Sequence, residues 1–182
     1  FFAKQLHDNL KIPIGVINSS WGGTSAEAWS PVHKIDINPA LSKSAEVLKE
    51  VPWGPIKKGV IYNAMIAPFK NFKIKGCLWY QGESNVPNAQ HYDKLLTTMI
   101  SAWREQWQEE IPFYYVQIAP YKYDEKDQGV LVRNAQRMAE STPNTGMVVI
   151  SDIGDTQDIH PKNKQDVGIR LANLAMKNLY YG

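Results

Sequence analysis

The chain is 182 residues long, with 43% hydrophobic and 21% charged residues and a formal net charge of +2. This length suits one domain with a substantial core, and this composition excludes an intrinsically disordered chain. The charge is too small, and the basic residues are too scattered, for a nucleic-acid-binding surface. No apolar run approaches the ~18 residues of a membrane span, so we expect neither nucleic acid nor a membrane as a partner.

The predicted elements begin with a helix, because Phe2, Leu6 and Leu10 fall at i, i+4 and i+8 and share one face. No initiator Met and no capping Ser, Thr, Asp or Asn precedes this stripe. We therefore expect the polypeptide to continue upstream of Phe1. The absence of a targeting segment then says nothing about location.

Short apolar runs that alternate with helical patterns define the rest of the chain. The runs predict buried strands at residues 12–18, 74–80, 112–119 and 146–151. Amphipathic helices are expected at residues 90–107, 129–141 and 166–180, and an irregular, proline-rich excursion with short helical pieces at residues 30–70. This alternation predicts a parallel sheet that is covered on both faces.

The loops after the predicted strands hold the candidate functional groups, because ligands of open parallel sheets bind beyond the carboxyl ends of the strands. These loops read "SSWGGTS", "QGESN", "PYKYDEK" and "DIGDTQDIHP". Polar loops are ordinary, but these combine a glycine pair, a carboxamide and an acid–histidine pair at three strand ends. The combination favours a functional site at that edge of the sheet.

The last of these loops contains a candidate general base, His160, two residues after Asp158. Imidazole accepts protons near neutral pH and works best when a carboxylate orients one ring nitrogen. The alternative is a surface loop in which the aspartate caps a turn or helix. His7, His33 and His91 lack such a neighbourhood, and we interpret them as surface or packing residues.

Two other loops contain candidate donors to a developing oxyanion. The backbone N–H groups of Gly22 and Gly23 can approach a ligand closely, and the carboxamide of Gln81 follows another strand. A plain turn is the alternative for the glycine pair. Glu83 is either a base or a structural carboxylate, and Ser84 fits only the first half of a nucleophile elbow.

Three further residues have two readings each, one functional and one structural. Trp21 and Trp29, in or near the first loop, are candidates for stacking on a sugar, with core packing as the alternative. The single cysteine, Cys77, lies in an apolar run, where a small buried hydrophobe is expected rather than a nucleophile. The chain has no phosphate loop, dinucleotide fingerprint or metal-site spacing, so we expect no cofactor and no metal.

Five stretches, taken together, resemble one family. "IPIGVINSSWGGTSAEAWSP", "YNAMIAPF", "IKGCLWYQGESN", "VRNAQ" and "DIGDTQDIHPKNKQDVGIRLANLAM" are similar, in this order, to the sialate O-acetylesterase-like carbohydrate esterases of the SGNH (GDSL-like) hydrolase superfamily. The resemblance covers nearly the whole chain. It implies one domain over residues 1–182 with a three-layer α/β/α sandwich and a flavodoxin-like parallel sheet.

The same resemblance implies a serine esterase that removes O-acetyl groups from carbohydrates through an acyl-enzyme, without a cofactor. Sialic acid and acetylated xylan-type glycans are the implied substrate classes, and a secreted or periplasmic location is implied because relatives act on host or plant glycans. The alternative is a non-catalytic carbohydrate-binding module on the same fold.

Roles follow for the residues that match the family motifs. His160 is implied as the catalytic base and Asp158 as the acid that orients it, with Asp155 and then Asp152 as alternatives. The implied oxyanion donors are Gln81 and either Gly23 or Gly22. Supporting or substrate-facing positions are Glu83, Arg133, Gln136 and Trp21.

The sequence departs from the family pattern at the nucleophile. The serine belongs in a "GQSN"-like motif after the first strand of the sheet, and that strand and motif would precede Phe1. None of the serines near the loops lies in such a motif: Ser19, Ser20, Ser25, Ser84 and Ser151. We therefore expect a missing N-terminal segment to complete the sheet and to supply the nucleophile.

Overall fold

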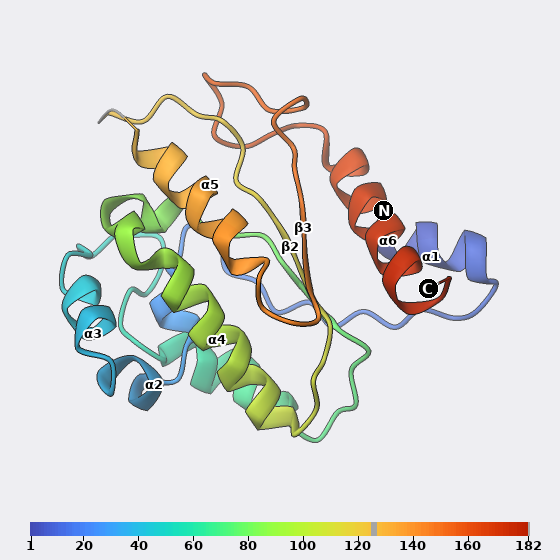
Figure 1. Ribbon diagram of the computed structural model, residues 1–182, viewed down its shortest axis with the longest axis horizontal. Helices are drawn as coiled ribbons and strands as arrows, with labels where there is room; N and C mark the ends of the chain where they lie inside the picture. The colour runs from blue at the N-terminus through green and yellow to red at the C-terminus, as the bar shows by residue number, and fades with distance from the viewer. Residues whose placement is uncertain (125–126, 182) are drawn as a thin grey trace.

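The computed structural model describes residues 1–124 and 127–181, and over these residues it has a three-stranded parallel sheet at its centre (Figure 1). The strands are β1 (Cys77–Trp79), β2 (Phe113–Val116) and β3 (Thr145–Val148), in the order β1-β2-β3. Both neighbouring pairs are parallel. The predicted parallel topology is confirmed, and each strand overlaps an apolar run that predicted it.

Helices of very different length connect the strands. The long ones are α1 (Phe2–Leu10), α4 (Tyr92–Trp107), α5 (Gln128–Ala139) and α6 (Lys164–Leu179), which confirm the four predicted helices. The proline-rich excursion has the expected short pieces, and further short helices flank it. These are η1 (Ala26–Trp29), α2 (Val32–Asp36), α3 (Pro39–Ala45), η2 (Tyr62–Ile66), η3 (Ala67–Phe69) and η4 (Glu83–His91).

Local signals in the sequence set the ends of the long helices. The side chain of Asn163 accepts a hydrogen bond from the backbone N–H of Asp166 and so caps the start of α6. Helix α4 ends where Gln108 adopts a left-handed conformation with φ of 51°. The start of α6 matters for the site, because this helix begins directly after the loop that contains His160.

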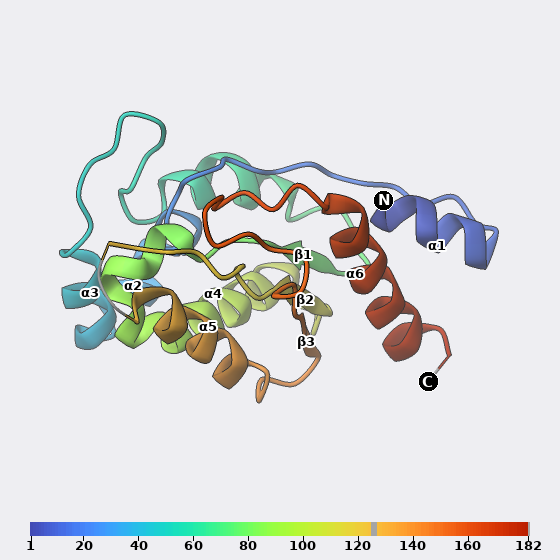
Figure 2. The ribbon, with the colours of Figure 1, turned by 90° about the horizontal axis from the view of Figure 1, so that it is seen from above.

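The helices cover the sheet in layers, as the alternation along β2 shows. Phe113 and Tyr115 belong to one apolar cluster with residues of α4 and α5. Tyr114 and Val116 belong to a second cluster with residues of α6 and α1. In Figure 2, α4 and α5 lie together on one side, and α1 lies alongside α6 away from them. This is the three-layer α/β/α arrangement expected from the sequence.

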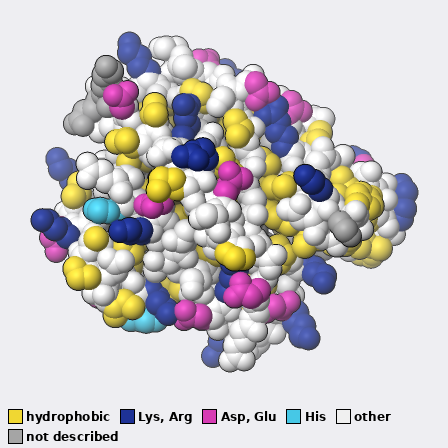
Figure 3. Space-filling model, viewed as in Figure 1, with side chains coloured by type: hydrophobic (Ala, Val, Ile, Leu, Met, Phe, Trp, Pro, Cys, Tyr) yellow, Lys and Arg dark blue, Asp and Glu magenta, His cyan; other side chains and the backbone are white. Residues whose placement is uncertain are grey.

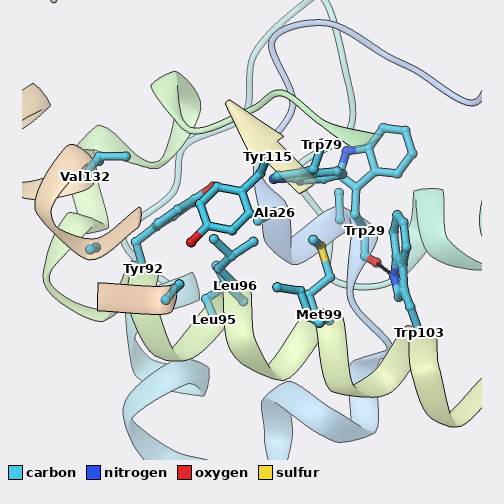
Figure 4. Close-up of a cluster of buried hydrophobic side chains, with 14 of the residues drawn as sticks. Ala26, Trp29, Trp79, Tyr92, Leu95, Leu96, Met99, Trp103, Tyr115 and Val132 are labelled. Atoms are coloured by element: carbon cyan, nitrogen blue, oxygen red, sulfur yellow. Dashed lines mark hydrogen bonds between the residues drawn. The ribbon is translucent and has the colours of Figure 1, made fainter. Parts of the chain in front are cut away.

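The larger cluster is rich in tryptophan. Trp79 makes edge-to-face contacts with Trp29 and Trp103, with ring centroids 5.7 and 5.8 Å apart. The indole of Trp103 donates a hydrogen bond to the carbonyl oxygen of Trp29 at 3.0 Å, drawn as a dashed line in Figure 4. Trp29 is only 3% exposed. The idea that Trp29 stacks on a sugar is therefore wrong, because its ring is part of the core.

Residues 12–18, predicted as the first strand, are not a strand in the structure. They form an irregular trace between α1 and η1 (Figure 2), and Ile12, Val16 and Ile17 are 43%, 70% and 45% exposed. An apolar run forms a strand only when a neighbour supplies donors and acceptors for its backbone. No described strand lies beside this segment, and the outer edge of β1 is likewise unpaired.

Charged side chains are dispersed over the face drawn in Figure 3, where basic and acidic groups alternate without a continuous basic surface. Within residues 1–124 and 127–181, no helix has the length and apolar character needed to cross a membrane.

Leu96 and Leu78 form a matched pair for testing the core. Leu96 is fully buried on α4, whereas Leu78 on β1 is 41% exposed. We expect Leu96→Ala to lower the free energy of unfolding by about 2–5 kcal/mol, because it removes buried methyl groups and leaves a cavity. Leu78→Ala should cost about 1 kcal/mol or less in this chain. Urea denaturation of both variants checks this, and equal losses would contradict the assignment of the core.

Candidate active site

The loop after β1 is fixed to the first glycine-containing loop through the side chain of Gln81. Its Nε2 donates to the carbonyl oxygen of Thr24 at 3.0 Å and to Asn85 Oδ1 at 2.8 Å. Its Oε1 accepts from the hydroxyl of Tyr92 at 2.9 Å. Both N–H groups of the carboxamide are thus engaged within the chain. Donation to an oxyanion would require Gln81 to exchange one of these bonds, and that role stays a prediction.

A buried acid, Glu27 in η1, connects the same two loops through hydrogen bonds. It is 1% exposed, and its carboxylate accepts hydrogen bonds from Asn85 Nδ2 at 2.8 Å and from Asn88 Nδ2 at 2.7 Å. Asn85 Oδ1 in turn accepts from the backbone N–H of Ala26 at 2.9 Å. The network satisfies a carboxylate that would otherwise be costly to bury, and it fixes the distance between the two loops.

The glycine pair of the first loop occupies an unusual backbone geometry. Gly23 has φ of +72°, a left-handed conformation that favours glycine. A Cβ at Gly23 would lie 2.6 Å from the indole nitrogen of Trp53, so the Trp53 ring lies directly against this residue. Nothing lies within 4 Å of the corresponding position at Gly22. Trp21, just before the pair, is 48% exposed, so it is available to a ligand in a way that Trp29 is not.

His160 lies in the loop between β3 and α6 with its side chain 88% exposed. The ring Nδ1 is 4.0 Å from Asp158 Oδ1, and the same carboxylate oxygen accepts the backbone N–H of His160 at 2.9 Å. The aspartate therefore both shapes the turn and lies beside the imidazole. The turn-capping bond of Asp158 is formed in the structure, and its role as an orienting acid stays a prediction.

The two alternative acids have other partners. Asp152 forms a two-pronged ion pair with Arg170, at 2.6 and 2.5 Å, and this pair lowers the pKa of Asp152 to about 2. The carboxylate of Asp155 accepts the backbone N–H of Gln157 at 2.9 Å. Of the three aspartates, Asp158 is the one in contact with the His160 ring, so the geometry favours it as the orienting acid.

The His160 loop and the β1 loop share one electrostatic environment. Burial raises the pKa of Glu83, and the positive charge of Lys164 opposes that rise. The ammonium of Lys164 lies 5.0 Å from the ring centroid of Tyr80, at the end of β1. The start of α6, four residues after His160, therefore lies beside the end of β1, and a site shared by His160, Glu83 and Gln81 stays a prediction.

Arg133 lines a cavity of about 470 Å³ beside this edge, together with Tyr121, Tyr123 and residues of the His160 loop such as Gln157. The cavity is large enough for a small ligand. Gln136, which shares a motif with Arg133, is instead structural. It is fully buried and bonds to the backbone of Ile118, Gln81 and Val116.

The structure also reveals residues that the sequence did not single out. Glu27 resembles an ordinary surface acid in the sequence, and Trp53 lies in an irregular stretch, so neither carried a signal. Cys77, predicted as a small buried hydrophobe, is half-buried and packs against the larger apolar cluster, and burial raises the pKa of its thiol to about 12. In the part of the chain that the structure describes, no three His, Cys, Asp or Glu residues are grouped to hold a metal.

The Glu27 network makes a direct prediction about stability. We expect Glu27→Ala to lower the free energy of unfolding by about 3 kcal/mol or more, because one N–H of each buried amide, that of Asn85 and that of Asn88, loses its carboxylate acceptor. Glu46, which is exposed, provides the control, and Glu46→Ala should cost about 0.5 kcal/mol or less. Urea denaturation measures both. Similar losses in the two variants would mean that the network does not hold the loops.

Glu83 predicts a dependence of stability on pH. Its folded-state pKa is raised, so the folded chain keeps this proton to higher pH than the unfolded chain. Below an unfolded-state pKa of about 4.3 both states are protonated, and as pH rises through the folded-state value the buried charge lowers stability. We therefore expect Glu83→Gln to raise the melting temperature at pH 7 and not at pH 4. A lower melting temperature for this variant at pH 7 would contradict the assignment.

With this geometry in place, the chain can be compared with known proteins. A family model described as "Carbohydrate esterase, sialic acid-specific acetylesterase" matches residues 1–177. The sialate O-acetylesterases of Pongo abelii and Homo sapiens are 36% and 35% identical over 202 residues, which cover 100% of this chain and 38% of each relative.

A solved structure agrees with the sequence comparisons. The crystal structure of a carbohydrate acetylesterase from Xanthomonas citri superposes with a TM-score of 0.85 and 36% identity, over 100% of this chain and 40% of that one. The chain therefore spans about two fifths of the length of these relatives. On the match over residues 1–177, the chain belongs to the sialic acid-specific acetylesterase family of carbohydrate esterases.

Proposed function

We propose that this chain is the part of a serine esterase that carries the base, its orienting acid and the oxyanion donors for removing O-acetyl groups from carbohydrates. The observation that carries the proposal is that Asp158 lies beside the His160 ring, in a loop that leads into α6 where Lys164 lies 5.0 Å from the ring centroid of Tyr80 at the end of β1. Sialic acid and acetylated xylan-type glycans are the proposed substrate classes.

The nucleophile in this proposal is a serine hydroxyl from outside the 182 residues. In residues 1–124 and 127–181, no serine hydroxyl forms a hydrogen bond to the His160 ring. Ser19 donates to the carbonyl oxygen of Met65 and Ser20 to the side chain of Asn18. Ser25 is 2% exposed and so is closed to substrate. These contacts support a separate source for the nucleophile.

The sheet itself supports an additional strand. The outer edge of β1 is unpaired, and Leu78 on this strand is 41% exposed. Residues 12–18 form a second apolar segment that pairs with no described strand, and Val16 in it is 70% exposed. A strand between them would pair both backbones and bury these side chains. We propose that the segment bearing the nucleophile forms this strand and completes a single SGNH-type domain.

The proposed reaction uses these side chains as follows. The serine oxygen attacks the acetyl carbonyl carbon while its proton passes to Nε2 of His160, because Nδ1 is the ring nitrogen that faces Asp158. Backbone N–H groups of Gly22 or Gly23, with Gln81, hold the oxyanion. The sugar hydroxyl leaves with the proton from His160. Water then cleaves the acetyl-serine with the same imidazole as base.

A comparison of two polypeptides tests the proposal. We expect the 182-residue chain to show no turnover of p-nitrophenyl acetate, and a longer polypeptide that includes the sequence upstream of Phe1 to be active. In the longer protein, His160→Ala should lower kcat/KM by about 10²–10⁴-fold, because the serine loses its base.

The exposed His33 on α2 provides the control, and His33→Ala should leave turnover unchanged. Full activity in the 182-residue chain would contradict the external nucleophile. Full activity of His160→Ala in the longer protein would contradict the assigned base. A longer protein that binds acetylated sugars without cleaving them would instead support a non-catalytic carbohydrate-binding module.

A further inference from the structure

Two exposed tryptophans, Trp21 in the first loop and Trp53 in the irregular stretch at residues 46–58, are each hydrogen-bonded to the backbone of the other's loop. The stretch that contains Trp53 projects from the body of the molecule in Figure 2. Trp53 is 61% exposed and Trp21 is 48% exposed. Large aromatic side chains are costly to expose, and an ordered pair of them on one surface is a frequent feature of ligand sites.

The two indoles are held in place by a reciprocal pair of hydrogen bonds. The indole N–H of Trp21 donates to the carbonyl oxygen of Trp53 at 2.9 Å, and that of Trp53 donates to the carbonyl oxygen of Gly23 at 3.1 Å. Both polar groups of the rings are thus satisfied within the protein. The surface that the rings leave exposed is therefore carbon and π surface, without an N–H group that needs water.

Two glycines allow this close packing. A Cβ at Gly54 would lie 3.1 Å from the indole nitrogen of Trp21, and a Cβ at Gly23 would lie 2.6 Å from that of Trp53. Each ring therefore lies against the backbone of the opposite loop and cannot rotate freely. Rings that are already ordered lose little conformational entropy when a ligand binds.

The pair is directly connected to the proposed oxyanion site. Trp53 bonds to the carbonyl of Gly23, and the next residue, Thr24, accepts the carboxamide of Gln81 at 3.0 Å. A sugar whose acetyl group reaches Gly22 or Gly23 therefore has its ring near the indoles. The apolar C–H faces of a pyranose match exposed aromatic rings, which offer a large surface with a negative face.

We propose that Trp53 and Trp21 form the subsite that holds the pyranose ring of the substrate. This inference rests on the proposed function. It identifies Trp53 as a residue that determines the specificity of the proposed esterase. The hydrogen bonds from the two indole N–H groups to backbone carbonyl oxygens fix the orientation of the rings, and the exposed ring surfaces contact the sugar. A purely structural role for the pair, tying the two loops together, makes different predictions in both experiments that follow.

The first experiment uses the 182-residue chain and needs no turnover. The six tryptophans give separate indole N–H signals in a ¹⁵N–¹H spectrum, and Trp21→Phe and Trp53→Phe assign two of them. Titration with 9-O-acetyl-N-acetylneuraminic acid should shift these two signals and leave that of Trp103, in the core, unchanged. The absence of any shift at Trp21 and Trp53, or equal shifts at all six, would overturn the subsite.

The second experiment uses the longer, active protein with two esters, 9-O-acetyl-N-acetylneuraminic acid and the sugar-free p-nitrophenyl acetate. Trp53→Ala should lower kcat/KM for the sugar ester by about tenfold or more relative to p-nitrophenyl acetate. Trp53→Phe, which keeps an aromatic ring but loses the indole N–H and part of the ring surface, should retain most of this preference. An equal loss on both esters would show that Trp53 acts only by positioning Gly23, and the inference would be wrong.

Phe72 provides the matched control, since it is 61% exposed like Trp53 and precedes β1, at the opposite end of the sheet. Phe72→Ala should leave both esters unaffected. If the wild-type longer protein cleaves neither ester, the proposed function fails, and the indole titration alone then decides whether the pair binds a sugar.

Discussion

The buried carboxylate of Glu27 is the constraint on which the candidate site depends. It accepts hydrogen bonds from two amides that lie 58 and 61 residues away in the sequence, those of Asn85 and Asn88. Charge-assisted bonds in a water-free environment are strong and directional, so they fix the two loops that they join. Asn85 also contacts the backbone of Ala26 and the carboxamide of Gln81, and so one acid determines how the glycine loop lies against the end of β1.

A second constraint acts at the other side of the same edge. The ion pair between Asp152 and Arg170 joins the end of β3 to α6 and brackets the loop that contains His160. Thr156 in that loop also accepts a backbone hydrogen bond from Lys122 at 3.0 Å, which ties it to the segment after β2. The imidazole itself stays exposed. The frame of the candidate site is therefore fixed by these bonds, while the imidazole that we propose as the base is exposed to solvent.

The sequence predicted the helices and strands, whose apolar patterns repeat over neighbouring residues. It missed the features that depend on contacts between residues far apart in the chain. The apolar stripes of α4, α5 and α6 and the runs of β1, β2 and β3 were visible because each pattern is local. Residues 12–18 have the same apolar character as the strands, but pairing requires a neighbour that local composition cannot supply. Trp29 and Trp21 look alike in the sequence, and only the contact with Trp79 reveals that Trp29 belongs to the core. Glu27 and Trp53 escaped for the same reason, since their partners lie far along the chain.

The open outer edge of β1 has a consequence for how this polypeptide behaves by itself. Unsatisfied backbone groups on a sheet edge can pair with any extended peptide, including the same edge of another copy. The neighbouring apolar side chains, Leu78 and Val16 among them, favour such contacts further. Edge-to-edge aggregation would therefore compete with the additional strand that we propose, and a strand in the same covalent chain would have the advantage of a high effective concentration.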